Sequence, residues 1–199
     1  MSYFLKKHPP LILASSSPYR QALLTKLHLN FSAVAPDIDE QFLAMEAPEM
    51  AALRISKLKA EALREQFPAH LIIGSDQVAM LGGTQLRKPG NRAETINQLK
   101  ACSGNSVLFY TAICVLDSQS GQKEQAIDLC QVFFKPLNEK SIINYVELEK
   151  PFDCAGGFKS EGLGIALIEK IKGDDPNALI GLPLIKLIGL LEKFYVSVI

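Results

Sequence analysis

Two kinds of hydrophobic pattern alternate along the chain. Short continuous apolar runs bounded by turn residues predict strands, which we place at 11–14, 30–36, 70–81, 106–117 and 128–135. Stretches in which apolar residues recur every three or four positions predict helices, which we place at 18–27, 50–67, 92–102, 139–148 and 183–194. Gly82-Gly83 predicts a hairpin turn, segment 164–173 fits a strand better than a short helix, and 41–50 has no assignment. This alternation predicts an α/β protein with a mixed sheet.

The composition is ordinary for a globular protein and narrows the classes of function. The 199 residues are 48% hydrophobic and 21% charged, which predicts one domain, 1–199, with two small lobes sharing a core as the alternative. Lys plus Arg and Asp plus Glu number 21 each, so we expect neither nucleic-acid binding nor a membrane surface. The most apolar segment, 178–191, is too short and too interrupted to span a bilayer and predicts a buried helix. The four cysteines form no CxxC pair, so we expect reduced thiols in a cytoplasmic protein.

The stretch LILASSSPYRQALL, residues 11–24, joins a predicted strand to a predicted helix. Ser17 suits the N-cap and Pro18 the first helical position, because proline lacks the N–H that would be unpaired there. Such a helix N-terminus can bind an anion, to which Ser15 adds a hydroxyl and Arg20 a charge that can hold two phosphate oxygens. Simple capping beside a surface arginine explains the same residues, so both interpretations stand at this point.

Two acidic features suggest chemistry. Asp76 follows a buried apolar strand in LIIGSDQV, at or near the expected end of that strand. A carboxylate at such a place is costly unless it is paired or binds a metal, and ligands of α/β sheets gather at strand ends. The alternative is an Asx-type turn. The segment PDIDE, 36–40, offers oxygen ligands suited to Mg²⁺ or Mn²⁺, or is a solvated acidic loop.

Three further features are ambiguous singly. Lys57 and Lys59 lie on a predicted helix and Lys88 precedes a proline, yet isolated lysines are usually solvated. AGGFKSEGLG, 155–164, has glycine pairs that allow close approach to a ligand or simply make turns. GDDPNALIGLP, 173–183, leads into the last predicted helix. Together with the serine loop and the carboxylates, these features favour an enzyme that acts on a phosphate ester.

Seven blocks carry a resemblance to a known family. LASSSPYRQALL, PDIDE, KAEAL, IGSDQV, RKP, FKSEGLGI and GDDPNALIGLPL occur in the order typical of the Maf family of nucleoside triphosphate pyrophosphatases. The chain resembles this family from about residue 11 to about residue 191, and most closely its 7-methyl-GTP pyrophosphatase branch. The resemblance implies cleavage between the α and β phosphates, a divalent cation (Mg²⁺ or Mn²⁺), and a cytoplasmic, often homodimeric protein. It also implies an elongated mixed α/β fold with a central cleft, related to inosine triphosphate pyrophosphatases.

The resemblance also implies roles for single residues. Asp76 corresponds to the family's catalytic base, although the sequence does not separate that role from metal binding. Glu40 corresponds to the acidic motif and, with Asp76, is expected to bind the metal. The phosphates are expected to be bound by Ser15, Arg20, Lys59 and Lys88.

Three positions bear on the base of the nucleotide. The common family loop SPRR is SPYR here, so Tyr19 replaces an arginine. The 7-methyl-GTP branch has an aromatic residue at this position, a glutamine at the position of Gln77 and a glutamate at the position of Glu161, as this chain does. The branch that hydrolyses dTTP and UTP has Arg, Thr and Gln instead. N7-methylation makes guanine cationic, an aromatic face attracts cations, and a carboxylate can accept from guanine's N1–H and amino group. We therefore expect 7-methyl-GTP, with other nucleotides such as dTTP or UTP, or a nucleotide-binding regulator of cell division with little turnover, as alternatives.

Overall fold

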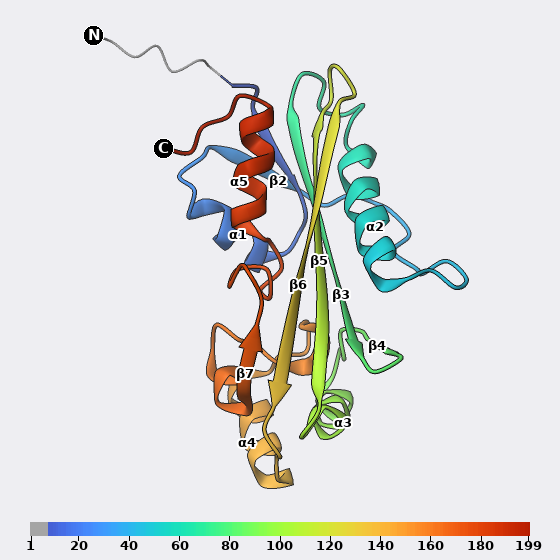
Figure 1. Cartoon of the computed structure of the whole chain (residues 1–199), viewed down its shortest axis with the longest axis vertical. Coiled ribbons are helices and arrows are strands. Elements are labelled where there is room, and N and C mark those ends of the chain that lie inside the picture. The colour runs from blue at the N-terminus through green and yellow to red at the C-terminus, as the bar shows by residue number, and fades with distance from the viewer. Residues whose placement is uncertain (1–7) are drawn as a thin grey trace.

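Three long antiparallel strands form the axis of the molecule, which the computed structural model describes for residues 8–199 (Figure 1). They are β3 (Leu71–Leu81), β5 (Ser106–Asp117) and β6 (Lys123–Phe134). Valine, isoleucine and phenylalanine recur along them, as is typical of strands that pack on both faces. β7 (Ile168–Lys172) continues the sheet beyond β6. The molecule is therefore elongated along these strands.

Shorter strands extend the other side of the sheet. β1 (Leu11–Ala14) pairs in parallel with β3, and β2 (Phe31–Val34) pairs in parallel with β1. β4 (Thr84–Leu86) returns against the end of β3 through the predicted Gly82-Gly83 turn, which is confirmed. The seven strands have the order β2-β1-β3-β5-β6-β7, with β4 beside β3. The predicted α/β class with a mixed sheet is therefore confirmed.

A gap in strand pairing occurs along one edge of β3. β1 ends opposite Gly74, and β4 begins pairing only at Ala79. Within the described part of the chain, residues 75–78 of β3 thus have no neighbouring strand on this side, whereas β5 continues to pair on the other. Side chains of these residues can reach a ligand that lies beside the sheet.

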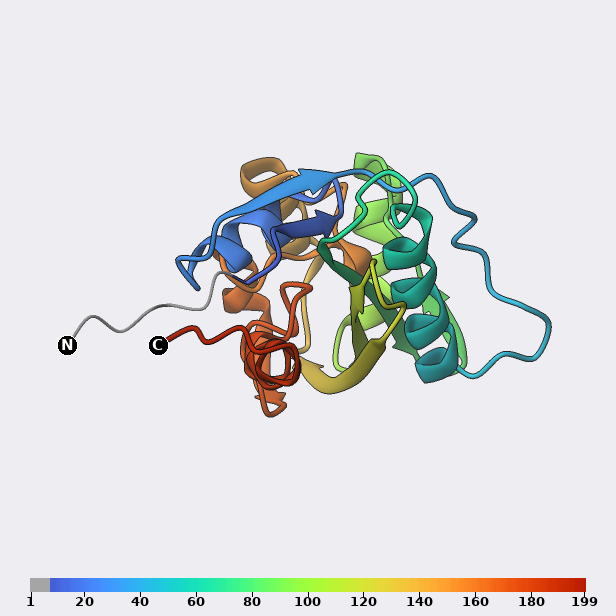
Figure 2. The ribbon, with the colours of Figure 1, turned by 90° about the horizontal axis from the view of Figure 1, so that it is seen from above.

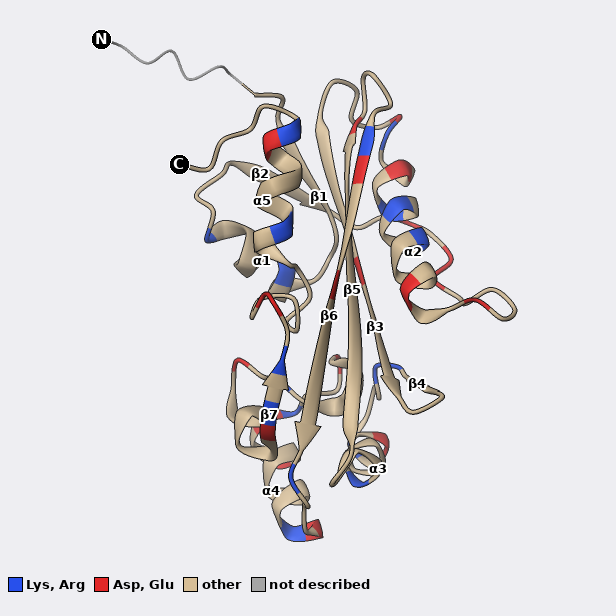
Figure 3. Cartoon of the chain, viewed as in Figure 1, with Lys and Arg blue, Asp and Glu red and all other residues tan. Residues whose placement is uncertain are grey.

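The helices cover both faces of the sheet. α2 (Pro48–Ala62) lies on one face and packs near Ile72, whereas α1 (Pro18–Thr25) and α5 (Leu184–Lys193) lie on the other, with Ile73 in their core (Figure 2). The far end of the long strands carries the remaining elements: α3 (Arg92–Cys102), α4 (Glu139–Glu149) and the 3₁₀ helices η1 (Ala155–Gly157) and η2 (Leu163–Leu167). Basic and acidic residues are interspersed over these elements (Figure 3). From residue 8 onward, no helix has both the length and the apolar character needed to cross a membrane.

Gly74 allows α2 to approach the sheet closely. A Cβ atom at this position would lie 2.1 Å from the Ser56 carbonyl oxygen and 2.9 Å from the Ala60 nitrogen, both in α2. Any larger residue would push the helix away from the sheet. Since α2 also carries Lys59, this close packing fixes a charged side chain beside β3.

Several predicted boundaries were wrong. The helix predicted at 50–67 begins at Pro48, which takes the first helical position, and gives way to turns after Ala62. The strand predicted from 128 begins at 123, because its charged first residues pair along β5 through a tight turn. Segment 164–173 is divided between η2 and β7. Of the apolar stretch 178–191, only the part from 184 is helical.

Candidate active site

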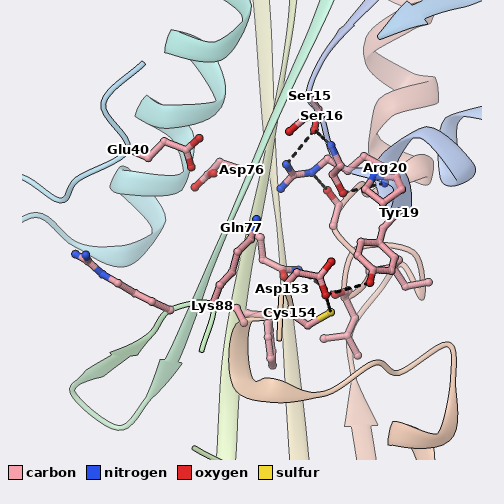
Figure 4. Close-up of a pocket in the computed structure, with 18 of the residues that line it drawn as sticks. Ser15, Ser16, Tyr19, Arg20, Glu40, Asp76, Gln77, Lys88, Asp153 and Cys154 are labelled. Atoms are coloured by element: carbon pink, nitrogen blue, oxygen red, sulfur yellow. Dashed lines mark hydrogen bonds between the residues drawn. The ribbon is translucent and has the colours of Figure 1, made fainter. Parts of the chain in front are cut away.

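A cavity of about 610 Å³ opens at the gap in the sheet. Its walls come from the loop after β1, from β3, from the segment after β4 and from the segments before η2 and α5. All nine residues predicted for the site border this cavity: Ser15, Tyr19, Arg20, Glu40, Lys59, Asp76, Gln77, Lys88 and Glu161. Most of them are seen together in Figure 4. The fold thus brings widely separated segments to one place.

The junction of β1 and α1 fixes the position of Arg20. Ser17 caps the helix by accepting from the Arg20 N–H at 3.4 Å, and Ser15 Oγ accepts from the Ser17 N–H at 3.1 Å. The Arg20 Nε atom donates to the Gly181 carbonyl at 2.8 Å, and Nη1 lies 3.5 Å from Ser15 Oγ (Figure 4). The predicted cap is confirmed. Because Nε is held by the protein, the terminal guanidinium nitrogens can face a ligand.

The surroundings of Arg20 favour an anion. Desolvation lowers the pKa of Arg20, while the carboxylates of Asp76 and Glu40 act in the opposite direction. The ordinary pKa of a guanidinium is so high that the group remains charged at neutral pH. A partly desolvated permanent cation attracts an anionic ligand more strongly than an exposed one does.

Asp76 lies in the middle of β3, so its predicted place at the end of a strand was wrong. The pairing of Asp76 with Ala112 in β5 continues the ladder to Leu81, and no Asx turn is formed. The carboxylate reaches the cavity because residues 75–78 have no strand beside them on the β1 side, within the described chain. Asp76 is nevertheless only 6% exposed, which makes an unpaired charge costly there.

Lys59 supplies the opposite charge. Its Nζ atom lies 2.7 Å from Asp76 Oδ1 and 3.0 Å from Glu40 Oε1. The Lys59 and Asp76 side chains are 7% and 9% exposed, whereas that of Glu40 is 54% exposed. One ammonium group therefore joins a buried and an open carboxylate at the cavity wall.

Gln77 points to the other face of β3. Its Nε2 atom lies 3.0 Å from three acceptors that share its two hydrogens: Thr111 Oγ1, the Ala178 carbonyl and the Leu179 carbonyl. Thr111 Oγ1 also donates to the Ala178 carbonyl at 2.9 Å. The amide nitrogen of Gln77 is thus used to attach the loop before α5, which leaves its oxygen as the group for a ligand.

The same loop is tied to the sheet at a second point. Ser75 Oγ donates a hydrogen bond to the Gly181 carbonyl at 2.9 Å, and the same carbonyl oxygen accepts from Arg20 Nε. Asp175, only 1% exposed, accepts from the backbone of Asn177 at 2.8 Å and of Ile185 at 2.6 Å. Asp175 therefore stabilises the loop and the start of α5 and does not border the cavity.

The acidic segment 36–40 contributes one carboxylate to the cavity. Glu40 borders it, whereas Asp37 and Asp39 do not, and Asp39 accepts from the Gln41 N–H at 2.9 Å. In residues 8–199, no three His, Cys, Asp or Glu side chains converge as a group that could hold a metal by itself. Glu40 and Asp76 alone would therefore leave most of the ligand positions of a divalent cation to other groups.

Two predicted residues lie on exposed segments at the cavity. Lys88 follows β4 and is exposed. Glu161 is also exposed, in the loop before η2, with one carboxylate oxygen 3.4 Å from Ser160 Oγ. Gly164 allows this loop to fold tightly, since a Cβ there would lie 2.3 Å from the Lys159 carbonyl oxygen. Both charged side chains are thus free to adjust to a ligand.

Asp153 and Cys154 are among the cavity residues that the sequence did not indicate. The Tyr19 hydroxyl donates to Asp153 Oδ1 at 3.2 Å, and Cys154 Sγ lies 3.5 Å from the same oxygen (Figure 4). Burial, Cys154 and Asp153 all raise the pKa of Tyr19, so the phenol stays protonated. No motif marks Asp153, because 134 residues separate it from its partner.

Comparison with known sequences gives one family and many similar proteins. Residues 10–194 match the family described as Maf-like protein. A 7-methyl-GTP pyrophosphatase of Hahella chejuensis is 56% identical over 187 residues, 94% of each chain. A protein of the same name from Nitrosococcus oceani is 50% identical over 93% of this chain and 93% of its own. Another from Vibrio vulnificus is 50% identical over 92% of this chain and 94% of its own.

Solved structures are more distant. The Ham1 protein of Staphylococcus aureus superimposes with a TM-score of 0.45 and 13% identity, over 64% of this chain and 72% of that one. A Ham1 protein from Coxiella burnetii gives a TM-score of 0.43 and 14% identity, over 80% and 91%. At these values the likeness carries no inference about the site.

Proposed function

The chain belongs to the Maf family, and we propose that it hydrolyses 7-methyl-GTP to 7-methyl-GMP and pyrophosphate. The observation that carries this proposal is one cavity bordered by the cations of Arg20, Lys59 and Lys88, by the buried carboxylate of Asp76, and by Tyr19 and Glu161. The relatives that are about half identical over nearly the whole chain are named for this activity. Cations, a proton acceptor and a base-binding region are what such a reaction requires.

The cations of the cavity bind the triphosphate. Arg20 is held at its Nε atom and can present its terminal nitrogens to two phosphate oxygens. Lys88 is exposed at the cavity edge and can follow the phosphates as they enter. Lys59 is oriented by its two carboxylates, so its position is set before substrate arrives.

The donor set at Lys59 fits a divalent cation. Glu40 and Asp76 both approach the same ammonium group, so their oxygens face one region of the cavity. Mg²⁺ commonly takes one or two carboxylates and completes its shell with substrate phosphates and water. Glu40 and Asp76 would hold the ion, which when bound would neutralise charge on the phosphate groups.

Asp76 is the proton acceptor in this proposal. Its carboxylate borders the cavity and lies 2.7 Å from the ammonium group of Lys59. It takes a proton from the water that attacks the α phosphorus, and pyrophosphate leaves from the opposite side. Binding the metal is the other role open to the same carboxylate.

Tyr19 and Glu161 bind the base. The Tyr19 ring offers a face to the cationic 7-methylguanine, and the exposed Glu161 carboxylate can accept from its N1–H and amino groups. The amide nitrogen of Gln77 does not contact the base, because it is hydrogen-bonded to Thr111 and to the loop before α5. It fixes the wall of the cavity and presents only its oxygen.

Pyrophosphate release from a panel of nucleotides tests the proposal. The purified protein is assayed with 7-methyl-GTP, GTP, dTTP, UTP and ITP, with Mg²⁺ and with Mn²⁺. We expect the highest kcat/KM for 7-methyl-GTP, and loss of turnover in D76N with its thermal stability retained. A preference for dTTP or UTP would refute the substrate, and no release from any nucleotide would favour the regulator.

A further inference from the structure

Asp153 is an acidic residue in the cavity to which the family resemblance gives no role. It lies between α4 and η1, and its Oδ1 atom accepts from the Tyr19 hydroxyl at 3.2 Å. Both residues border the cavity, as Figure 4 shows, on the side away from Glu40 and Asp76. Asp153 therefore stands beside the ring that the proposed function assigns to the base.

A carboxylate at this place strengthens the attraction of the ring for a cation. A phenol that donates to a carboxylate gains electron density in its ring, and ring attraction for cations depends on that density. Tyrosine attracts cations less strongly than tryptophan, so the bond to Asp153 offsets a weakness of Tyr19. The negative charge of Asp153 adds a direct attraction to any cation bound against the ring.

The positive charge of Lys159 lies near the Tyr19 ring and opposes the binding of a cationic base there. Its Nζ atom lies 5.6 Å from the centroid of the Tyr19 ring, and Lys159 does not border the cavity. The ring face that borders the cavity is therefore open to a ligand, but the nearby ammonium opposes a second cation. Asp153 supplies a negative charge on the cavity side of this group. Glu161 is a further carboxylate that borders the cavity.

We propose that Asp153 is a specificity-determining residue, which favours nucleotides with a positively charged purine base over neutral ones through its charge and its bond to Tyr19. The inference rests on the proposed function and deepens it. It assigns selectivity to the charge of the base, and not only to the shape of its methyl group.

The test compares three nucleotides that separate charge from shape. 7-Methyl-GTP has the methyl group and the charge, 7-methyl-7-deaza-GTP has the methyl group alone, and GTP has neither. In D153N we expect the ratio of kcat/KM for 7-methyl-GTP to that for its deaza analogue to fall about three- to tenfold, through KM. D153E keeps the charge and should keep the ratio. D174N, which removes an exposed aspartate outside the cavity, is the matched control.

A double-mutant cycle tests the link to Tyr19. Y19F removes the hydroxyl and should lower the same ratio, whereas adding Y19F to D153N should lower it little further. An unchanged ratio in D153N, with a wild-type preference for 7-methyl-GTP, would overturn this inference and leave the proposed function intact. A wild-type enzyme without that preference would instead refute the proposed function. Equal losses in D153N and D153E would show that the charge plays no part.

Discussion

Replacing Lys59 by methionine should leave Asp76 as a buried charge without its partner. In the native protein the two side chains are 7% and 9% exposed, and their charged atoms are 2.7 Å apart. Glu40, the other partner of Lys59, is 54% exposed and can turn to solvent, so the loss in free energy of unfolding arises at Asp76. Methionine retains the apolar stem that packs in α2, which restricts the change to the charge.

The size of the effect follows from the burial of Asp76. Removing one partner of a buried ion pair destabilises proteins by about 3–5 kcal/mol. Because Asp76 borders the cavity and can draw some water to it, we expect a loss of about 3 kcal/mol in K59M, the low end of that range. The buried charge left without a partner, not lost packing, causes this change, so K59M/D76N should regain most of the stability.

Urea unfolding at pH 7 followed by circular dichroism measures these free energies. A loss below about 1 kcal/mol, or a double variant no more stable than K59M, would refute the reasoning. M50L, at an exposed position of α2, is a control for changes in that helix.

Three other predictions concern the cavity, the core and the thiols. R20K should raise KM about tenfold with a smaller change in kcat, because lysine cannot bond the loop carbonyl at 2.8 Å and still hold two phosphate oxygens; an unchanged KM would contradict this. G74A should destabilise by about 3 kcal/mol in urea unfolding, since its Cβ would meet a helix carbonyl, whereas G83A, with no atom within 4 Å, should not. Burial raises the pKa of Cys102 and of Cys114 to about 12, so both bind their protons more tightly in the folded state, and stability should fall as pH rises above about 9. Rapid reaction of both with a thiol reagent in the native protein would oppose the last prediction.

The sheet was predictable from the sequence because its strands are marked by local pattern. The strands predicted at 70–81 and 106–117 lie within a residue of those observed. β6 was harder, since its first residues, KEQAID, are polar and reveal a strand only through their pairing with β5. Polar strand ends of this kind carry no periodic signal.

The sequence pattern indicated two different places for Asp76. The strand predicted at 70–81 contains it, whereas a glycine, a serine and an aspartate after an apolar run resemble the end of a strand. β3 continues past Asp76 because β5 pairs with it on the other side. What ends at this point is the neighbouring strand, β1, opposite Gly74. The access of Asp76 to the cavity is thus a property of the sheet, which depends on where another strand stops.

Contacts between distant segments could not be predicted either. The family pattern indicates Tyr19 and Glu161, but the bond from Tyr19 to Asp153 joins residues 134 positions apart. The three acceptors of the Gln77 amide group similarly come from β5 and from the loop before α5. A single sequence does not indicate such contacts, because they depend on which distant segments the fold brings together.

Hydrolysis of 7-methyl-GTP in ¹⁸O-labelled water tests the central claim most directly. If the cavity directs water to the α phosphorus, mass spectrometry should find pyrophosphate without label and 7-methyl-GMP with one ¹⁸O atom. In D76N both products should be lost together. Release of inorganic phosphate and 7-methyl-GDP, or label in the pyrophosphate, would contradict the account.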